Sequence, residues 1–176
     1  MTEILDSLIE RLARVLAARR EMLATAESCT GGGIAAACTD RAGSSAWFER
    51  GLVTYSNEAK RELLGVPAAA IEQHGAVSEP VALAMAEGAL QRSPAAWSLA
   101  VTGVAGPGGG TATKPVGTVW IAVARRAGSA VTSRAALHRF AGDRRAVRLA
   151  AVVESLSMLL AELDQSADGV RNPGDT

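Results

Sequence analysis

Thr25-Ala-Glu-Ser-Cys-Thr-Gly-Gly-Gly33 is the stretch around which the chain is organised. A short apolar run, 21–26, leads into it and another, 34–38, follows, which predicts a strand, a tight turn and a helix. Such a turn presents backbone N–H groups at a helix start, where the dipole adds partial positive charge, and its glycines allow a ligand to approach closely. The stretch therefore favours a cradle for an anion or oxyanion. A glycine-rich connection whose Ser and Thr only cap the helix stays open. Neither the P-loop pattern nor the dinucleotide fingerprint fits.

Composition limits the class of protein. The 176 residues suit one domain, and 48% hydrophobic with 20% charged residues is globular composition. A formal net charge of zero gives no support for binding nucleic acid or an anionic membrane. The apolar runs are too short for a membrane span and the amino terminus has no signal-peptide pattern. We expect a cytoplasmic protein with no nucleic-acid or membrane partner.

The residues that usually bind metals are scarce. The only cysteines are Cys29 and Cys38, at no metal-ligand spacing, and the only histidines are His74 and His138. We therefore expect no metal site and no cofactor.

Strand and helix patterns alternate along the chain, which predicts an α/β sheet covered on both faces. Helices are expected over 3–19, 34–40, 58–64, 79–92 and 144–163, strands over 21–26, 51–55, 97–102 and 117–124, and an edge strand over 131–140. Four candidate stretches, 28–33, 55–60, 102–110 and 140–144, directly follow predicted strands. Ligands of open α/β sheets bind outside the carboxyl ends of strands, so these stretches predict one shared site. The domain is expected over 1–164 and a disordered tail over 165–176.

Three side chains compete as nucleophile: Ser28 and Cys29 on the first turn, and Ser45 in the first turn of a second short helix. A hydroxyl needs a base to take its proton. The histidines lack an obvious carboxylate partner, and a surface imidazole is the simpler interpretation of each.

Lys60 is the favoured base. Of the 18 basic residues 16 are Arg, and unlike Arg, Lys can lose its proton. With Asn57 as the helix cap, Lys60 lies near a helix start, whose dipole disfavours an ammonium, and burial would lower its pKa further. Tyr55 precedes it by five residues, close enough to share a hydrogen-bond network. A solvated Lys60 that pairs with a neighbouring glutamate is the alternative.

Five ordered motifs resemble the CinA C-terminal domain family, and more narrowly its stand-alone members. They are Ala26-Glu-Ser-Cys-Thr-Gly-Gly32, the run from Gly43 to Lys60, His74-Gly-Ala-Val-Ser-Glu-Pro80, Gly103-Val-Ala-Gly-Pro107 and Lys114-Pro-Val-Gly-Thr-Val-Trp120. The resemblance covers about residues 5–163. It implies a single three-layer α/β/α domain with a mixed, mostly parallel sheet.

The resemblance also implies an activity, which is hydrolysis of the carboxamide of nicotinamide mononucleotide to nicotinate mononucleotide and ammonia, without a metal. It assigns Ser45 as nucleophile, Lys60 as base and Tyr55 as their partner, with Ser28 as the alternative nucleophile. Substrate or oxyanion contacts carry over to Ser28, Thr30, Gly31, Gly32, Thr102, Gly103 and Arg144. A homo-oligomer, specifically a dimer, is expected. Two rival functions remain, an amidohydrolase of another small amide and a non-catalytic nucleotide-binding module. The chain departs from its relatives at Gly108-Gly109-Gly110, a loop expected to affect nucleotide affinity more than chemistry.

Overall fold

Five strands form one mixed sheet in the computed structural model, which describes residues 2–168. Their order is β2-β1-β3-β4-β5. The strands are β1 (Leu23–Glu27), β2 (Phe48–Val53), β3 (Trp97–Gly103), β4 (Thr118–Ala127) and β5 (Ala130–Arg139). β1 pairs parallel with β2 and β3, whereas β4 runs antiparallel to both β3 and β5. The carboxyl ends of β1, β2 and β3 therefore meet at one edge of the sheet.

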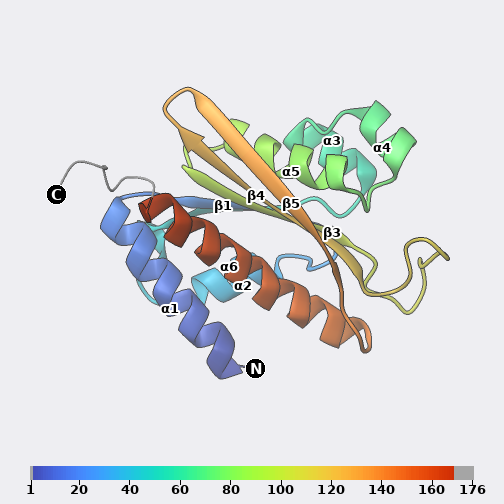
Figure 1. The fold of residues 1–176 in the computed structure, drawn as a ribbon, viewed down its shortest axis with the longest axis horizontal. Coiled ribbons are helices and arrows are strands. Elements are labelled where there is room, and N and C mark those ends of the chain that lie inside the picture. The colour runs from blue at the N-terminus through green and yellow to red at the C-terminus, as the bar shows by residue number, and fades with distance from the viewer. Residues whose placement is uncertain (1, 169–176) are drawn as a thin grey trace.

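Helices cover both faces of this sheet (Figure 1). One face carries α1 (Thr2–Arg19), α2 (Gly33–Thr39) and α6 (Arg144–Asp168), and the other carries α3 (Asn57–Leu64), α4 (Ala68–His74) and α5 (Glu79–Gln91). A 3₁₀ turn, η1 (Ser44–Ala46), leads into β2. The expected three-layer α/β/α domain with a mixed sheet is confirmed.

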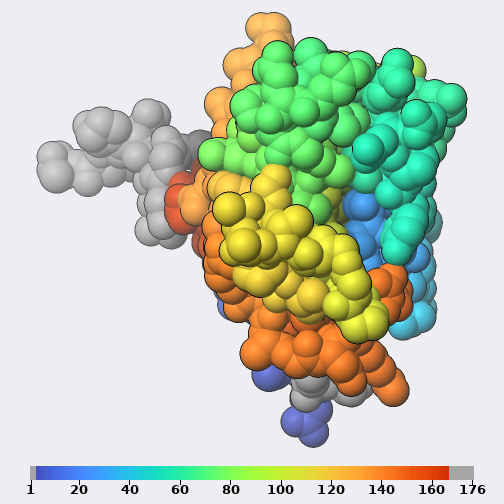
Figure 2. All heavy atoms as spheres, turned by 90° about the vertical axis from the view of Figure 1, so that its right-hand side faces the viewer, coloured from blue at the N-terminus to red at the C-terminus, as the bar shows by residue number. Residues whose placement is uncertain are grey.

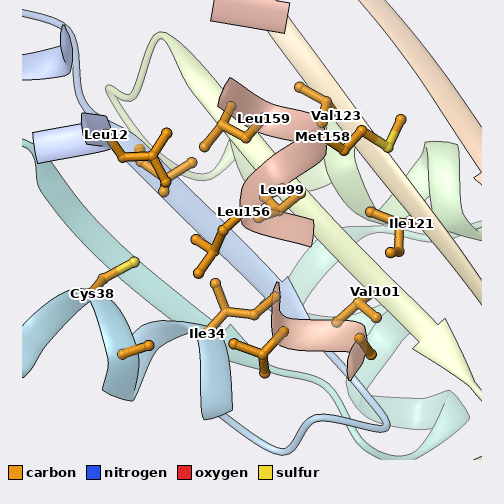
Figure 3. Packing of buried hydrophobic residues seen from close by; sticks show 14 of the residues in the cluster. Leu12, Ile34, Cys38, Leu99, Val101, Ile121, Val123, Leu156, Met158 and Leu159 are labelled. Carbon is orange, nitrogen blue, oxygen red and sulfur yellow. The ribbon is translucent and has the colours of Figure 1, made fainter. Parts of the chain in front are cut away.

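The two faces of the sheet are packed with side chains of different size. Branched side chains of the central strands, including Leu99, Val101 and Ile121, lie against α1, α2 and α6 (Figure 3). Several of the alternate residues on the face covered by α5, such as Ala100 and Ala122, are alanines. Because these side chains are small, α5 can pack close to the sheet. α5 also packs closely against the end of α3, where a Cβ added at Gly88 would overlap the Leu64 carbonyl oxygen.

Several predicted boundaries shift. β2 begins at Phe48 instead of residue 51, and α4 was not predicted because it is a short Ala-rich segment with little periodicity. Ser56, not Asn57, caps α3, since the Ser56 hydroxyl accepts the Ala59 N–H at 3.0 Å. β5 does lie at the edge of the sheet, as predicted.

The carboxy-terminal helix is longer than expected. α6 continues to Asp168, so residues 165–168 of the predicted tail are helical. The remainder of that prediction, 169–176, lies outside the described residues. Among the described helices, none has the length and apolarity needed to cross a membrane.

Candidate active site

Ser28 and Lys60 meet at the carboxyl edge of the sheet. Ser28 follows β1, and its backbone N–H donates to the Val101 carbonyl of β3 at 3.0 Å. Lys60 lies one turn into α3, and its Nζ donates to the Ser28 hydroxyl at 3.0 Å. A serine hydroxyl and an amine within hydrogen-bond distance form the basic unit of serine nucleophile activation.

The amine of Lys60 is buried without a counter-ion. Its side chain is 1% exposed, and no carboxylate in residues 2–168 forms a salt bridge with it. Its other two partners are the carbonyl oxygens of Thr54, at 2.8 Å, and Tyr55, at 3.3 Å. Desolvation lowers the pKa of Lys60 from its ordinary value of 10.5 because burial disfavours the ammonium.

The partners of Lys60 also determine how a neutral amine would be oriented. Carbonyl oxygens can only accept hydrogen bonds, whereas a hydroxyl can also donate. A neutral Lys60 would therefore direct its two N–H groups to Thr54 and Tyr55 and its lone pair to the Ser28 hydroxyl.

Ser28 and Lys60 open into a cavity of about 230 Å³. Each of the four segments predicted to converge contributes to its wall, which is formed by Ser28, Cys29, Tyr55, Asn57, Lys60, Ala76, Val77, Thr102, Gly103, Ala105 and Arg144. Figure 2 shows this face of the molecule, where the yellow β3–β4 loop, the teal α3 region and the orange start of α6 surround the blue segment after β1. The predicted convergence at the carboxyl ends of the strands is confirmed.

Ser45 lies elsewhere. It is an exposed residue of η1, which precedes β2, and the first residue of β2 pairs with the first residue of β1. Because β1 and β2 are parallel, Ser45 is at the amino edge of the sheet and Ser28 is at the carboxyl edge. The sequence-based expectation that Ser45 adjoins Lys60 is wrong, since the length of β2 separates them.

Tyr55 contacts Lys60 only through its backbone. Its hydroxyl instead accepts from Arg144 Nη2 at 3.0 Å, while Arg144 Nη1 donates to the Gly106 carbonyl at 2.8 Å. This pair joins the segment before α3 to the start of α6 at the cavity, and Tyr55 is 61% exposed. Tyr55 and Arg144 thus form part of the cavity wall beside the Ser28–Lys60 pair.

The other predicted contacts divide into two groups. Thr102 and Gly103 line the cavity, although the Thr102 hydroxyl is engaged with the Ala76 carbonyl at 2.9 Å. A side chain at Gly103 would collide with Val119 of β4. Thr30, Gly31 and Gly32 shape the turn and are not among the residues of the cavity wall. The Thr30 hydroxyl donates to Glu27 at 2.6 Å, and both glycines have positive φ.

Cys29 lies beside Ser28 as a buried thiol. Desolvation raises its pKa to about 11, so the thiolate needed for nucleophilic attack is disfavoured. Within residues 2–168 the N–H group of Cys29 donates no hydrogen bond to another residue, which leaves a backbone donor in the cavity wall beside Ser28.

Sequence reasoning missed four wall residues, Asn57, Ala76, Val77 and Ala105. All lie in the quoted motifs, so the signal that could have found them was their position in a motif, not their chemistry. Glu27 was also given no role, although it directly precedes Ser28.

A second cavity, of about 770 Å³, adjoins the first and shares Ala105 and Arg144 with it. Its wall also contains Arg145 and Arg148 at the start of α6, beside Asp143. Three guanidinium groups at one helix start can bind an anion of the size of a phosphate. In residues 2–168 no cluster of three or more His, Cys, Asp or Glu side chains is arranged to hold a metal ion.

Sequence comparisons agree with this geometry. The family model described as CinA C-terminal domain matches residues 5–163. Nicotinamide-nucleotide amidohydrolase PncC of Escherichia coli K12 is 50% identical over 162 residues, which are 92% of this chain and 96% of the relative. The PncC of Enterobacter agglomerans is 52% identical over 158 residues, or 90% and 94% of the two chains.

Solved structures resemble the fold closely. The competence/damage inducible protein CihA from Agrobacterium tumefaciens matches with a TM-score of 0.87 and 47% identity, over 92% of this chain and 96% of that one. A CinA superfamily protein from Klebsiella pneumoniae matches with a TM-score of 0.84 and 40% identity, over 92% and 98%. The family match, the similar sequences and the shared fold together show that the chain belongs to the CinA C-terminal domain family.

Proposed function

We propose that the chain is an amidohydrolase that converts nicotinamide mononucleotide to nicotinate mononucleotide and ammonia, with Ser28 as nucleophile and Lys60 as general base. The observation that carries the proposal is the hydrogen bond between Ser28 and a buried lysine in a cavity at the carboxyl edge of the sheet. The relatives named nicotinamide-nucleotide amidohydrolase, which align over almost their whole length, supply the substrate.

Acylation begins when neutral Lys60 takes the hydroxyl proton and Ser28 Oγ attacks the carboxamide carbon. The N–H group of Cys29, which lines the cavity beside Ser28, is a donor for the tetrahedral oxyanion. Lys60 then returns the proton to the nitrogen as the C–N bond breaks. This gives ammonia and an ester between Ser28 and the nicotinoyl group.

Deacylation uses the same pair. Lys60 takes a proton from water, the resulting nucleophile attacks the ester carbonyl, and the proton passes to Ser28 Oγ as the acyl–oxygen bond breaks. A base that takes up a proton and releases it again within one cycle must have a pKa that is not far above working pH. Burial of Lys60 lowers its pKa in that direction.

The division of the site into two adjoining cavities suits a nucleotide. The small cavity holds the reacting amide, and the larger one offers Arg144, Arg145 and Arg148 to the phosphate. A module that only binds nucleotides has no need of a deprotonable amine beside a serine, so the pair favours the enzyme.

The test is the release of ammonia and nicotinate mononucleotide from nicotinamide mononucleotide by purified, EDTA-treated protein. We expect turnover that chelation does not reduce. Saturable binding without ammonia would establish the binding module instead, and ammonia from other pyridine amides alone would change the substrate. The homodimer expected from the sequence stays a prediction, which light scattering of the same sample tests.

A further inference from the structure

Within residues 2–168, Glu27 is the one buried carboxylate beside the Ser28–Lys60 pair, and the mechanism above gives it no role. It ends β1, between β2 and β3, and its side chain is fully buried. No Arg, Lys or His of residues 2–168 forms a salt bridge with it. A buried carboxylate without a counter-ion must be satisfied by hydrogen-bond donors.

Four donors surround the Glu27 carboxylate. Oε2 accepts the Thr30 hydroxyl at 2.6 Å and the Ile34 N–H at 3.0 Å. Oε1 accepts the Ala35 N–H at 2.8 Å and, more weakly, the Thr25 hydroxyl at 3.4 Å. Each oxygen therefore holds one backbone N–H from the first turn of α2.

These contacts replace an ordinary helix cap. The N-cap residue of α2 is Gly32, which has no side chain to accept the free N–H groups. Glu27 supplies the cap from the preceding strand, and the turn that carries Ser28 lies between the two anchored ends. The Ser28 backbone is thereby held at β1 on one side and at α2 on the other.

Glu27 also links the nucleophile to the base. Its backbone carbonyl accepts the Thr54 N–H at 2.7 Å, and the Thr54 carbonyl in turn accepts Lys60 Nζ at 2.8 Å. The residue thus connects two segments of the chain, one carrying Ser28 and the other carrying Lys60.

We propose that the Glu27 carboxylate is a positioning residue that fixes the Ser28 turn in the geometry for attack and so sets the rate of acylation. The proposal rests on Ser28 being the nucleophile of the proposed function. It adds that a residue outside the cavity wall determines how fast Ser28 reacts without determining how tightly substrate binds. Binding groups such as Tyr55, Gly103 and Arg144 lie on other segments and form no hydrogen bond with the Glu27 carboxylate.

Glu27→Gln is the sharpest substitution because it preserves shape and removes one acceptor. Whichever way the amide is turned, its NH2 group meets a backbone N–H of α2, either that of Ile34 or that of Ala35. No rotation of the side chain restores both bonds, so the turn must shift. A displacement of about 1 Å at a reacting atom can cost on the order of 100-fold in rate.

Two measurements on folded protein test the proposal. The first is kcat and KM for nicotinamide mononucleotide. The second is the rate at which a fluorophosphonate labels Ser28, followed by mass spectrometry, which needs no substrate. We expect Glu27→Gln to lower kcat and the labelling rate each by about 10- to 100-fold, with KM changed by less than about threefold.

Glu21→Gln is the matched control. Glu21 lies just before β1, at the other end of the strand, and accepts the Trp97 Nε1–H at 2.7 Å. This variant should keep kcat and the labelling rate within about twofold of wild type, whatever its melting temperature. If Glu27→Gln retains both rates, or if its KM rises as much as its kcat falls, the positioning role is overturned.

If Glu27→Gln does not fold, Thr30→Val provides a second test. This nearly isosteric substitution removes only the 2.6 Å hydrogen bond from the Thr30 hydroxyl to Glu27. It should slow labelling of Ser28 by about three- to tenfold, and an unchanged labelling rate would overturn the proposal. Failure of the proposed function would give a different result. In that case wild-type protein releases no ammonia from nicotinamide mononucleotide, while Ser28 labelling still compares the variants.

Discussion

The choice between Ser28 and Ser45 can be tested by two single substitutions. Ser28→Ala removes the hydroxyl that contacts Lys60 Nζ, whereas Ser45→Ala changes an exposed side chain of η1. The six residues of β2 separate the two positions, which at about 3.3 Å per residue amounts to roughly 20 Å. Only one of these serines can therefore react with a substrate held beside Lys60.

The expected magnitudes differ widely. Loss of an activated serine nucleophile costs on the order of 10⁶-fold in kcat, about 8 kcal/mol of barrier, so Ser28→Ala should fall to the limit of detection. Its folding loses one buried hydrogen bond, which is about 1–2 kcal/mol and a melting temperature lower by about 2–8 °C. Ser45→Ala should change stability by less than about 0.5 kcal/mol and leave turnover near wild type.

The assay measures ammonia and nicotinate mononucleotide from nicotinamide mononucleotide, with a thermal melt and substrate binding on each variant. Binding separates the nucleophile from a folding defect, because folded Ser28→Ala should still bind substrate through the rest of the cavity. An active Ser28→Ala protein together with an inactive, folded Ser45→Ala protein would refute the reasoning.

Three other outcomes follow from the same geometry. Since burial lowers the pKa of Lys60, kcat/KM should rise with pH to a midpoint below 10.5, and this rise should be absent in Lys60→Met. The lowered pKa should also make the folded protein more stable as pH rises from the folded pKa of Lys60 towards 10.5, because the unfolded chain binds more protons in that range. Melting temperatures measured over a series of pH values check this. Cys29→Ala should keep at least about a tenth of wild-type turnover because its raised pKa of about 11 disfavours the thiolate, and loss of all activity in a folded variant would make Cys29 the nucleophile. Gly88→Ala should lower the melting temperature by several degrees, since the new methyl overlaps the Leu64 carbonyl at a cost of about 1–3 kcal/mol that exceeds the gain in helix propensity, and an unchanged melt would contradict the close α3–α5 packing.

Local patterns determined most of the fold. The largely apolar runs of β3 and β4 predict strands buried on both faces, and the leucine stripe of α1 predicts a helix with one covered side. Order along the chain then implies helices on both faces. The short helix α4 could not be predicted because its sequence has little periodicity. The end of α6 could not be predicted because no proline or glycine occurs near it before Gly169.

The position of the site was also in the sequence, because each candidate stretch follows a strand and parallel strands end at the same edge. Tertiary structure alone decided which serine meets Lys60. Ser28 follows the end of β1 and Ser45 precedes the start of β2, and parallel pairing of these strands sends the two serines to opposite edges. The same holds for the Tyr55–Arg144 pair, whose members are 89 residues apart and meet only when the helices pack on the sheet. The donors to Glu27 lie within eight residues of it, but they follow no helical or strand period, so local patterns did not indicate them. Short-range patterns record the periodicity of each element, but contacts between elements depend on strand order and direction, which no single stretch of sequence contains.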